Sequence, residues 1–139
     1  MKTYTQLQKF LTLKDRYNYL RLGGKVGEAT FGSQRRINQI LYQSKKWREV
    51  RNFVILRDNG CELGLEDYKI SGQIMVHHIM PLTIVDILNH DQKCFDPNNL
   101  ICCSLELHNA LHYNQSYDSI INLYFEEYHE RTKNDTKLW

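Results

Sequence analysis

The sequence predicts a single α+β domain in which a β-hairpin and a short helix are wrapped by additional helices. Apolar residues recur every three or four positions in the N-terminal third and again near residue 107, which is typical of amphipathic helices. Between these regions, residues 68–79 form two β-rich runs around a Ser-Gly turn signal. The length of 139 residues, of which 42% are hydrophobic, suits one domain with its own core.

The N-terminal part is expected to be helical. Residues 3–22 carry apolar side chains mostly three or four positions apart, which predicts a helix. Residues 23–32 are punctuated by glycines and predict a loop. Residues 33–44 are expected to form a short helix capped by Ser33.

A further helix is predicted after Ser44, a plausible N-cap, and is expected to end at the sequence "DNG", residues 58–60. Basic residues occupy most of its remaining surface. Its apolar stripe is expected to hold Trp47, Val50, Phe53 and Val54.

The β-rich segment predicts a hairpin around Ser71 and Gly72, with His77 and His78 at the end of its second strand. Pro81 cannot continue a central strand. Neighbouring side chains of a strand point to opposite faces. The two histidines must therefore divide one task, or only one of them is used.

The C-terminal half is expected to contain short elements. Residues 83–90 predict one or two helical turns, residues 91–100 a loop, and the following "LICC" a short apolar run. Ser104 is expected to cap a helix that carries His108 and His112. A further helix is predicted over residues 117–130, followed by a polar tail.

Charge is distributed unevenly along the chain. Residues 1–57 hold 13 Lys or Arg and three acids, a net charge of +10, whereas residues 58–139 hold five bases and 13 acids, a net charge of −8. A basic half indicates a polyanionic partner such as nucleic acid. The alternative is a solvated charged surface in which the two halves neutralise each other.

Several protein classes are disfavoured. No run of about 18 apolar residues exists, so no membrane span is expected, and the N-terminus lacks the features of a secretory signal. The four cysteines form no C-x-x-C pair, which makes a poor disulfide framework and a poor zinc knuckle. We therefore expect a cytoplasmic protein.

Four of the six histidines fall into two groups: the adjacent pair and an i, i+4 pair on a helix. The i, i+4 spacing lets His108 and His112 reach one metal ion, and His77 would be a third ligand that leaves a coordination position open. His78 would then be free to act as a general base.

The ordered set "VHHIMP", "DPNNLI" and "LHNALHY" resembles the HNH endonucleases of the ββα-metal group, and "WREVRNFVILRDNGC" resembles the segment that precedes their core. The resemblance is firmest over residues 47–113. It implies a ββα-metal HNH core, a β-hairpin and a helix around a metal, over residues 58–115. A basic helical part, 1–57, would precede this core, and a C-terminal helix and tail, 116–139, would follow it.

The resemblance also implies residue roles. His77, His108 and His112 match the metal ligands, and His78 matches the general base. Asn99 matches the asparagine that braces the loop between strand and helix and so helps to orient the base.

One divalent metal ion is expected as cofactor, with zinc, nickel, cobalt, manganese and magnesium left open. Many relatives also hold a structural zinc between two C-x-x-C pairs. Here Gly64 follows Cys61 by three residues, and Ser104 and Leu107 stand where the second pair is expected. No structural zinc is therefore expected, and the hydrophobic core, Leu107 included, would have to brace the motif.

The implied reaction is the hydrolysis of DNA phosphodiester bonds, with a 5′-phosphate and a 3′-hydroxyl as products. Arg51 and Arg57 are the candidate phosphate contacts. Equally, they could be solvated or paired with Glu49 or Asp58.

A weaker likeness of "YLRLGGKVGEATFG" and "KNDT" to small HNH proteins of phages and prophages makes a phage terminase a plausible partner beside DNA. The alternative is a catalytically idle HNH-fold module that binds DNA or terminase.

Other residues are interpreted as structural. Trp47, Phe53 and Tyr113 are expected in the core rather than stacked on nucleobases, and Cys102 and Cys103 in or near the core. His90 and His129 belong to no motif and are expected at the surface.

Overall fold

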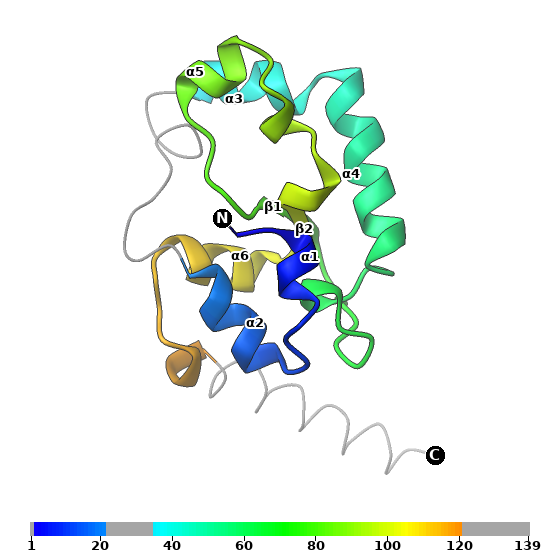
Figure 1. The fold of residues 1–139 in the computed structure, drawn as a ribbon, viewed down its shortest axis with the longest axis vertical. Helices are drawn as coiled ribbons and strands as arrows, with labels where there is room; N and C mark the ends of the chain where they lie inside the picture. The colour runs from blue at the N-terminus through cyan, green and yellow to red at the C-terminus, as the bar shows by residue number, and fades with distance from the viewer. Residues whose placement is uncertain (1, 22–34, 121–139) are drawn as a thin grey trace.

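The computed structural model describes residues 2–21 and 35–120. Helices surround a small antiparallel sheet of two strands, β1 (Ile74–His78) and β2 (Leu100–Ser104) (Figure 1). The expected α+β class is confirmed. In the register of the two strands, His77 lies opposite Ile101 and His78 opposite Leu100.

The predicted hairpin around Ser71 and Gly72 is wrong. Within the described residues, the first β-rich run makes only an isolated bridge between Lys69 and Cys61. β1 pairs instead with the apolar run that forms β2, at the far end of the connecting segment 79–99, which contains short helices. Every residue of β2 is buried, so this strand occupies the centre of the core and is the natural partner for β1.

The single helix expected over residues 3–22 is two helices, α1 (Tyr4–Leu7) and α2 (Leu13–Leu20). Thr12 interrupts it, because its extended backbone and its side chain, which accepts from the Asp15 N–H, form a new N-cap. The structure next describes α3 (Arg35–Tyr42). The predicted glycine loop and the predicted cap Ser33 lie outside the described residues.

The helix predicted after Ser44 is confirmed as α4 (Lys45–Arg57), and the Ser44 hydroxyl accepts from the Trp47 N–H. It ends at Asp58, and the next two residues adopt positive φ angles. Its core residues are Trp47 and Val54. The expectation that Phe53 and Tyr113 are core residues is wrong, because they are 54% and 61% exposed.

The remaining elements are short. They are η2 (Glu62–Gly64), α5 (Ile84–Leu88), η3 (Gln92–Cys94), η4 (Pro97–Asn99) and α6 (Leu105–His112). Ser104 caps α6 as predicted, by accepting from the Leu107 N–H. Residues 117–120 are helical, and the rest of the predicted C-terminal helix and tail lies outside the described residues.

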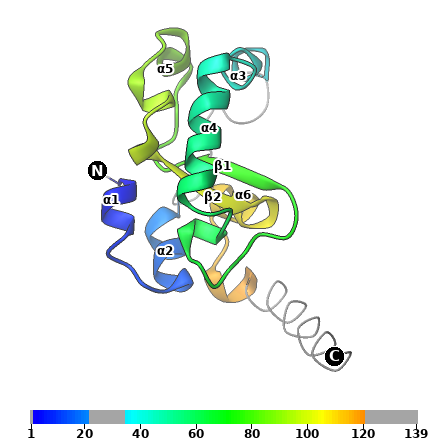
Figure 2. The ribbon, with the colours of Figure 1, turned by 90° about the vertical axis from the view of Figure 1, so that its right-hand side faces the viewer.

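The sheet separates two apolar clusters. α4 covers one face, and α6 with α2 covers the other (Figures 1 and 2). The α4 face carries Ile74, Val76, Leu100 and Cys102, and the α6 face carries Met75, Ile101 and Cys103. Leu107 also packs in the cluster on the α6 face, as expected.

Buried carboxylates cover the outer edge of β2. Asp58 Oδ2 accepts from the Cys102 N–H at 3.0 Å, and Glu62 Oε1 accepts from the Ser104 N–H at 2.5 Å. These side chains satisfy backbone donors that a third strand would otherwise satisfy. Cys102 and Cys103 are fully buried, as predicted. No helix of the described ranges has the length and apolar character needed to cross a membrane.

Candidate metal centre

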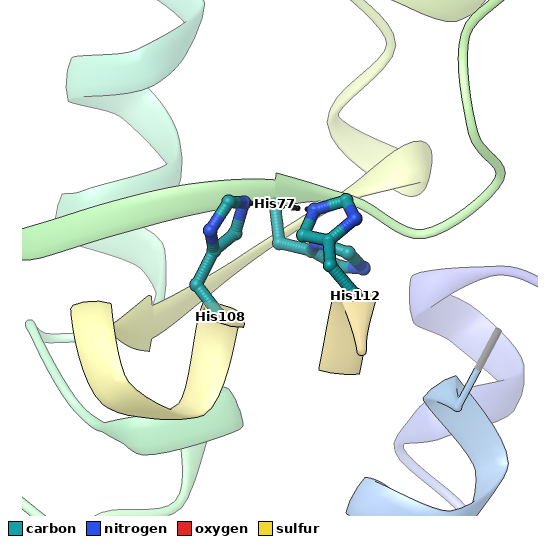
Figure 3. Close-up of side chains that lie close together, drawn as sticks. All are labelled: His77, His108 and His112. Carbon is teal, nitrogen blue, oxygen red and sulfur yellow. Dashed lines mark hydrogen bonds between the residues drawn. The ribbon is translucent and has the colours of Figure 1, made fainter. Parts of the chain in front are cut away.

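Three histidines meet between β1 and α6 (Figure 3). His77 comes from the strand, and His108 and His112 lie one turn apart on the helix. The ring of His77 lies 5.4 Å from that of His108 and 5.1 Å from that of His112, centroid to centroid. One ring nitrogen from each histidine can be chosen so that all three lie within 4.8 Å of one another. This cluster could hold a metal ion.

His77 is only 1% exposed, and neither of its ring nitrogens has a hydrogen-bond partner among the described residues. Burying a polar group without a partner costs free energy, and a metal ion that binds a ring nitrogen is one explanation for such a group. Burial is the largest cause that lowers the pKa of His77, followed by the charges of His108 and His112. His77 is therefore neutral at physiological pH, the form in which imidazole binds metals.

The helix histidines are already close to a chelating arrangement. Their Nε2 atoms lie 3.1 Å apart. Two nitrogens that bind one tetrahedral zinc at about 2.05 Å lie about 3.3 Å from each other. Burial lowers the pKa of both histidines, to about 4 for His112. The donor set and its protonation state thus fit a divalent metal.

His78 lies on the other face of β1, under α4. Its Nε2 is 3.1 Å from the Cys94 carbonyl oxygen, which can only accept, so we assign the proton of the neutral ring to Nε2. Nδ1 is then the nitrogen with a free lone pair. Burial lowers the pKa of His78 to about 4, the hydrogen bond to Cys94 opposes this shift, and the charge of His108 adds to it.

Asn99 braces the loop that leaves His78. Its Oδ1 accepts from the Met80 N–H at 2.8 Å, and its Nδ2 donates to the carbonyls of Met80 and Lys93. The Lys93 carbonyl immediately precedes Cys94, whose own carbonyl holds His78. Asn99 is buried, at 7% exposed, and its side chain links Met80 at the start of this segment to Lys93 near its end.

The two candidate phosphate contacts are bound to the protein core. Arg51 donates to the Ile74 carbonyl at 3.2 Å. Arg57 donates to Asp58 and to the carbonyls of Pro97 and Leu100, and its guanidinium stacks on a tyrosine ring. The pairing with Asp58 is thus the alternative that the structure favours for Arg57. A phosphate contact by either arginine stays a prediction.

Two neighbours of His78 were not predicted as parts of the site. Trp47, whose indole stacks on the His78 ring, was predicted only as a core residue, and Cys94, whose carbonyl contacts His78, only as part of a loop. Stacking on a histidine from another element and a backbone carbonyl contact leave no local signal in a sequence. His90 is exposed, as expected, and His129 lies outside the described residues.

Comparisons of the chain with protein-family models, with curated proteins and with solved structures found no match.

Proposed function

We propose that the protein is a metal-dependent HNH-type endonuclease that hydrolyses DNA phosphodiester bonds. One observation carries the proposal: three neutral histidines converge on one face of β1, and a fourth, His78, is held in a defined tautomer on the other face. A metal centre near a separate base is an arrangement that can carry out metal-assisted hydrolysis.

His77, His108 and His112 would hold the metal. When bound, a divalent ion supplies positive charge that stabilises the phosphoryl oxygens and the leaving 3′-oxygen. Three imidazoles suit zinc, nickel, cobalt or manganese better than magnesium, which prefers oxygen ligands.

His78 would take the proton from the attacking water. Its Nδ1 is the acceptor, because Nε2 carries the proton donated to Cys94. A pKa of about 4 keeps the ring neutral at pH 7. The Cys94 carbonyl favours the protonated ring, as the direction of its effect on the pKa indicates, so it would stabilise the imidazolium that forms.

The basic N-terminal part supports a polyanionic substrate, since residues 1–57 carry a net charge of +10. The choice of DNA rests on the resemblance of the histidine motifs to HNH endonucleases. The phage origin and a terminase partner rest on the weaker likeness of "YLRLGGKVGEATFG" and "KNDT" to small phage and prophage proteins.

Plasmid cleavage by purified protein tests the proposal. The protein is stripped of metal and resupplied with Mg, Mn, Ni, Co or Zn, one at a time, beside the His78→Ala variant. His90→Asn is a matched control, because His90 is exposed and has a positive φ that asparagine tolerates.

We expect nicking or linearisation with at least one metal, its loss in His78→Ala, and its retention in His90→Asn. Folded protein that binds DNA but cleaves with no metal would favour the idle binding module instead.

A further inference from the structure

The indole of Trp47 lies against the imidazole of His78. The ring centroids are 5.2 Å apart and the planes differ by 24°, a stacked arrangement. Both side chains are buried, at 5% and 8% exposed. Tyr42 completes the group, with its ring edge-on to Trp47 at 5.1 Å and 6.4 Å from His78.

The stack and the hydrogen bond to Cys94 restrict different motions of the imidazole. Contact with the flat indole resists tilting of the ring plane, whereas the Nε2–H bond to the Cys94 carbonyl fixes rotation within that plane. Together they restrict the orientation of the ring and hence the direction in which Nδ1 points.

Both restraints are themselves held by capping and bracing contacts. The Ser44 hydroxyl accepts from the Trp47 N–H at the start of α4. Asn99 donates to the Lys93 carbonyl beside Cys94. The His78 ring is therefore held by Trp47 of α4 on one side and by Cys94, in the segment before β2, on the other.

We propose that Trp47 is a positioning residue for His78, an inference that rests on the general-base role given to His78 in the proposed function. Without the indole, the imidazole gains freedom to tilt, and Nδ1 spends less time aimed at the water. A misplacement of about 1 Å in a reacting group can cost on the order of 10²-fold in rate.

A merely structural Trp47 would behave differently. Trp47 also belongs to the apolar cluster that contains Val54, Val76, Leu100 and Cys102. If filling this cluster were its only role, truncating another member would have the same consequences. Val54→Ala is therefore the matched control, because Val54 is fully buried in the same cluster.

The test compares Trp47→Leu, Trp47→Phe and Val54→Ala in two measurements. The first is NMR of the His78 ring, in which ¹⁵N shifts report the tautomer and a protected Nε2–H resonance reports the bond to Cys94. The second is the kinetics of cleavage with the active metal, with kcat separated from KM.

We expect Trp47→Leu to lose the protected resonance and to lower kcat by roughly 10²-fold with KM unchanged. Trp47→Phe, which keeps an aromatic face, should restore most of both. Val54→Ala should lower stability only. A folded Trp47→Leu with the wild-type resonance would overturn the inference, as would an equal loss of kcat in Val54→Ala.

Two further outcomes are separable. If the wild-type protein cleaves no DNA, the proposed function fails, while the resonance still decides whether Trp47 orients His78. If Trp47→Leu does not fold, Trp139→Phe leaves Trp47 as the sole tryptophan, since the chain has two. In that background, His78→Ala should change the fluorescence emission of Trp47. Unchanged emission would contradict the stacking of Trp47 on His78 and so overturn the inference.

Discussion

His77 and His78 are consecutive in β1, yet their rings lie on opposite faces of the sheet, one beside α6 and the other beside Trp47 on α4. The alternation of a strand thus separates a candidate metal ligand from a candidate base by a single peptide bond. The two faces are not electrostatically isolated, because the charge of His108 lowers the pKa of His78 and the charge of His78 lowers the pKa of His112. One strand end can therefore serve both parts of a metal-assisted hydrolysis.

Acid should destabilise the metal-free protein. The folded-state pKa values of His78 and His112, about 4, lie below the ordinary value of 6.5, so the unfolded chain binds more protons between these limits. The contribution of these two histidines to the free energy of unfolding is fully present above pH 6.5. It falls as the pH drops towards 4, by about 1.4 kcal/mol per pH unit for each histidine. Urea unfolding between pH 4.5 and 7.5 measures this slope.

The control for this acid effect is His112→Gln, which removes one of the titrating groups. Its stability should fall less steeply with acid than that of the wild-type chain. Parallel slopes for the two proteins would show that His112 is not held neutral by the fold.

Arg57→Ala should destabilise the fold by about 3 kcal/mol, because it removes the guanidinium paired with the buried Asp58 carboxylate and its hydrogen bonds to the Pro97 and Leu100 carbonyls. Arg48→Ala, at an exposed position of the same helix, should change stability by no more than about 0.5 kcal/mol. Denaturant titrations compare the two. A variant of Arg57 with wild-type stability and weakened DNA binding would support the phosphate-contact interpretation instead.

Asn99→Asp should cost about 2 kcal/mol and lower the cleavage rate, because the carboxylate cannot donate to the Met80 and Lys93 carbonyls. Asn98→Asp is the neighbouring control. Among the described residues, the hydrogen bonds of the Asn98 side chain are those that its Oδ1 accepts from the Thr5 N–H and hydroxyl, and a carboxylate oxygen can accept both. Thermal unfolding and cleavage assays compare the two variants. Equal losses of stability and cleavage rate in Asn99→Asp and Asn98→Asp would contradict the bracing role of Asn99.

DNA binding should weaken steeply as salt increases, because the basic N-terminal part would release counterions from the phosphates. Replacing the exposed bases Lys45, Lys46 and Arg48 by glutamine should reduce the salt slope by about one for each phosphate that the protein no longer neutralises. Fluorescence anisotropy with a labelled duplex measures both. Salt-independent affinity would exclude residues 1–57 as the DNA-facing part.

The features that the sequence predicted correctly are local ones. Ser44 and Ser104 cap α4 and α6 by contacting residues three positions ahead, and the spacing of His108 and His112 is a property of one helix. The pairing of β1 with β2 was missed because β2 follows the connecting segment 79–99, whereas the Ser71-Gly72 turn signal lies just before β1 in the sequence. The contacts of Arg57 with the Pro97 and Leu100 carbonyls and the stack of Trp47 on His78 join segments distant in sequence, so no local pattern indicates them.

The division of labour within β1 is tested most directly by measuring metal affinity and cleavage together in His78→Ala and His112→Ala. We predict that His78→Ala binds the metal as tightly as the wild-type protein, by calorimetry, but does not cleave DNA. His112→Ala should lose both metal binding and cleavage. Cleavage at the wild-type rate by His78→Ala, or unchanged metal affinity in His112→Ala, would contradict the account.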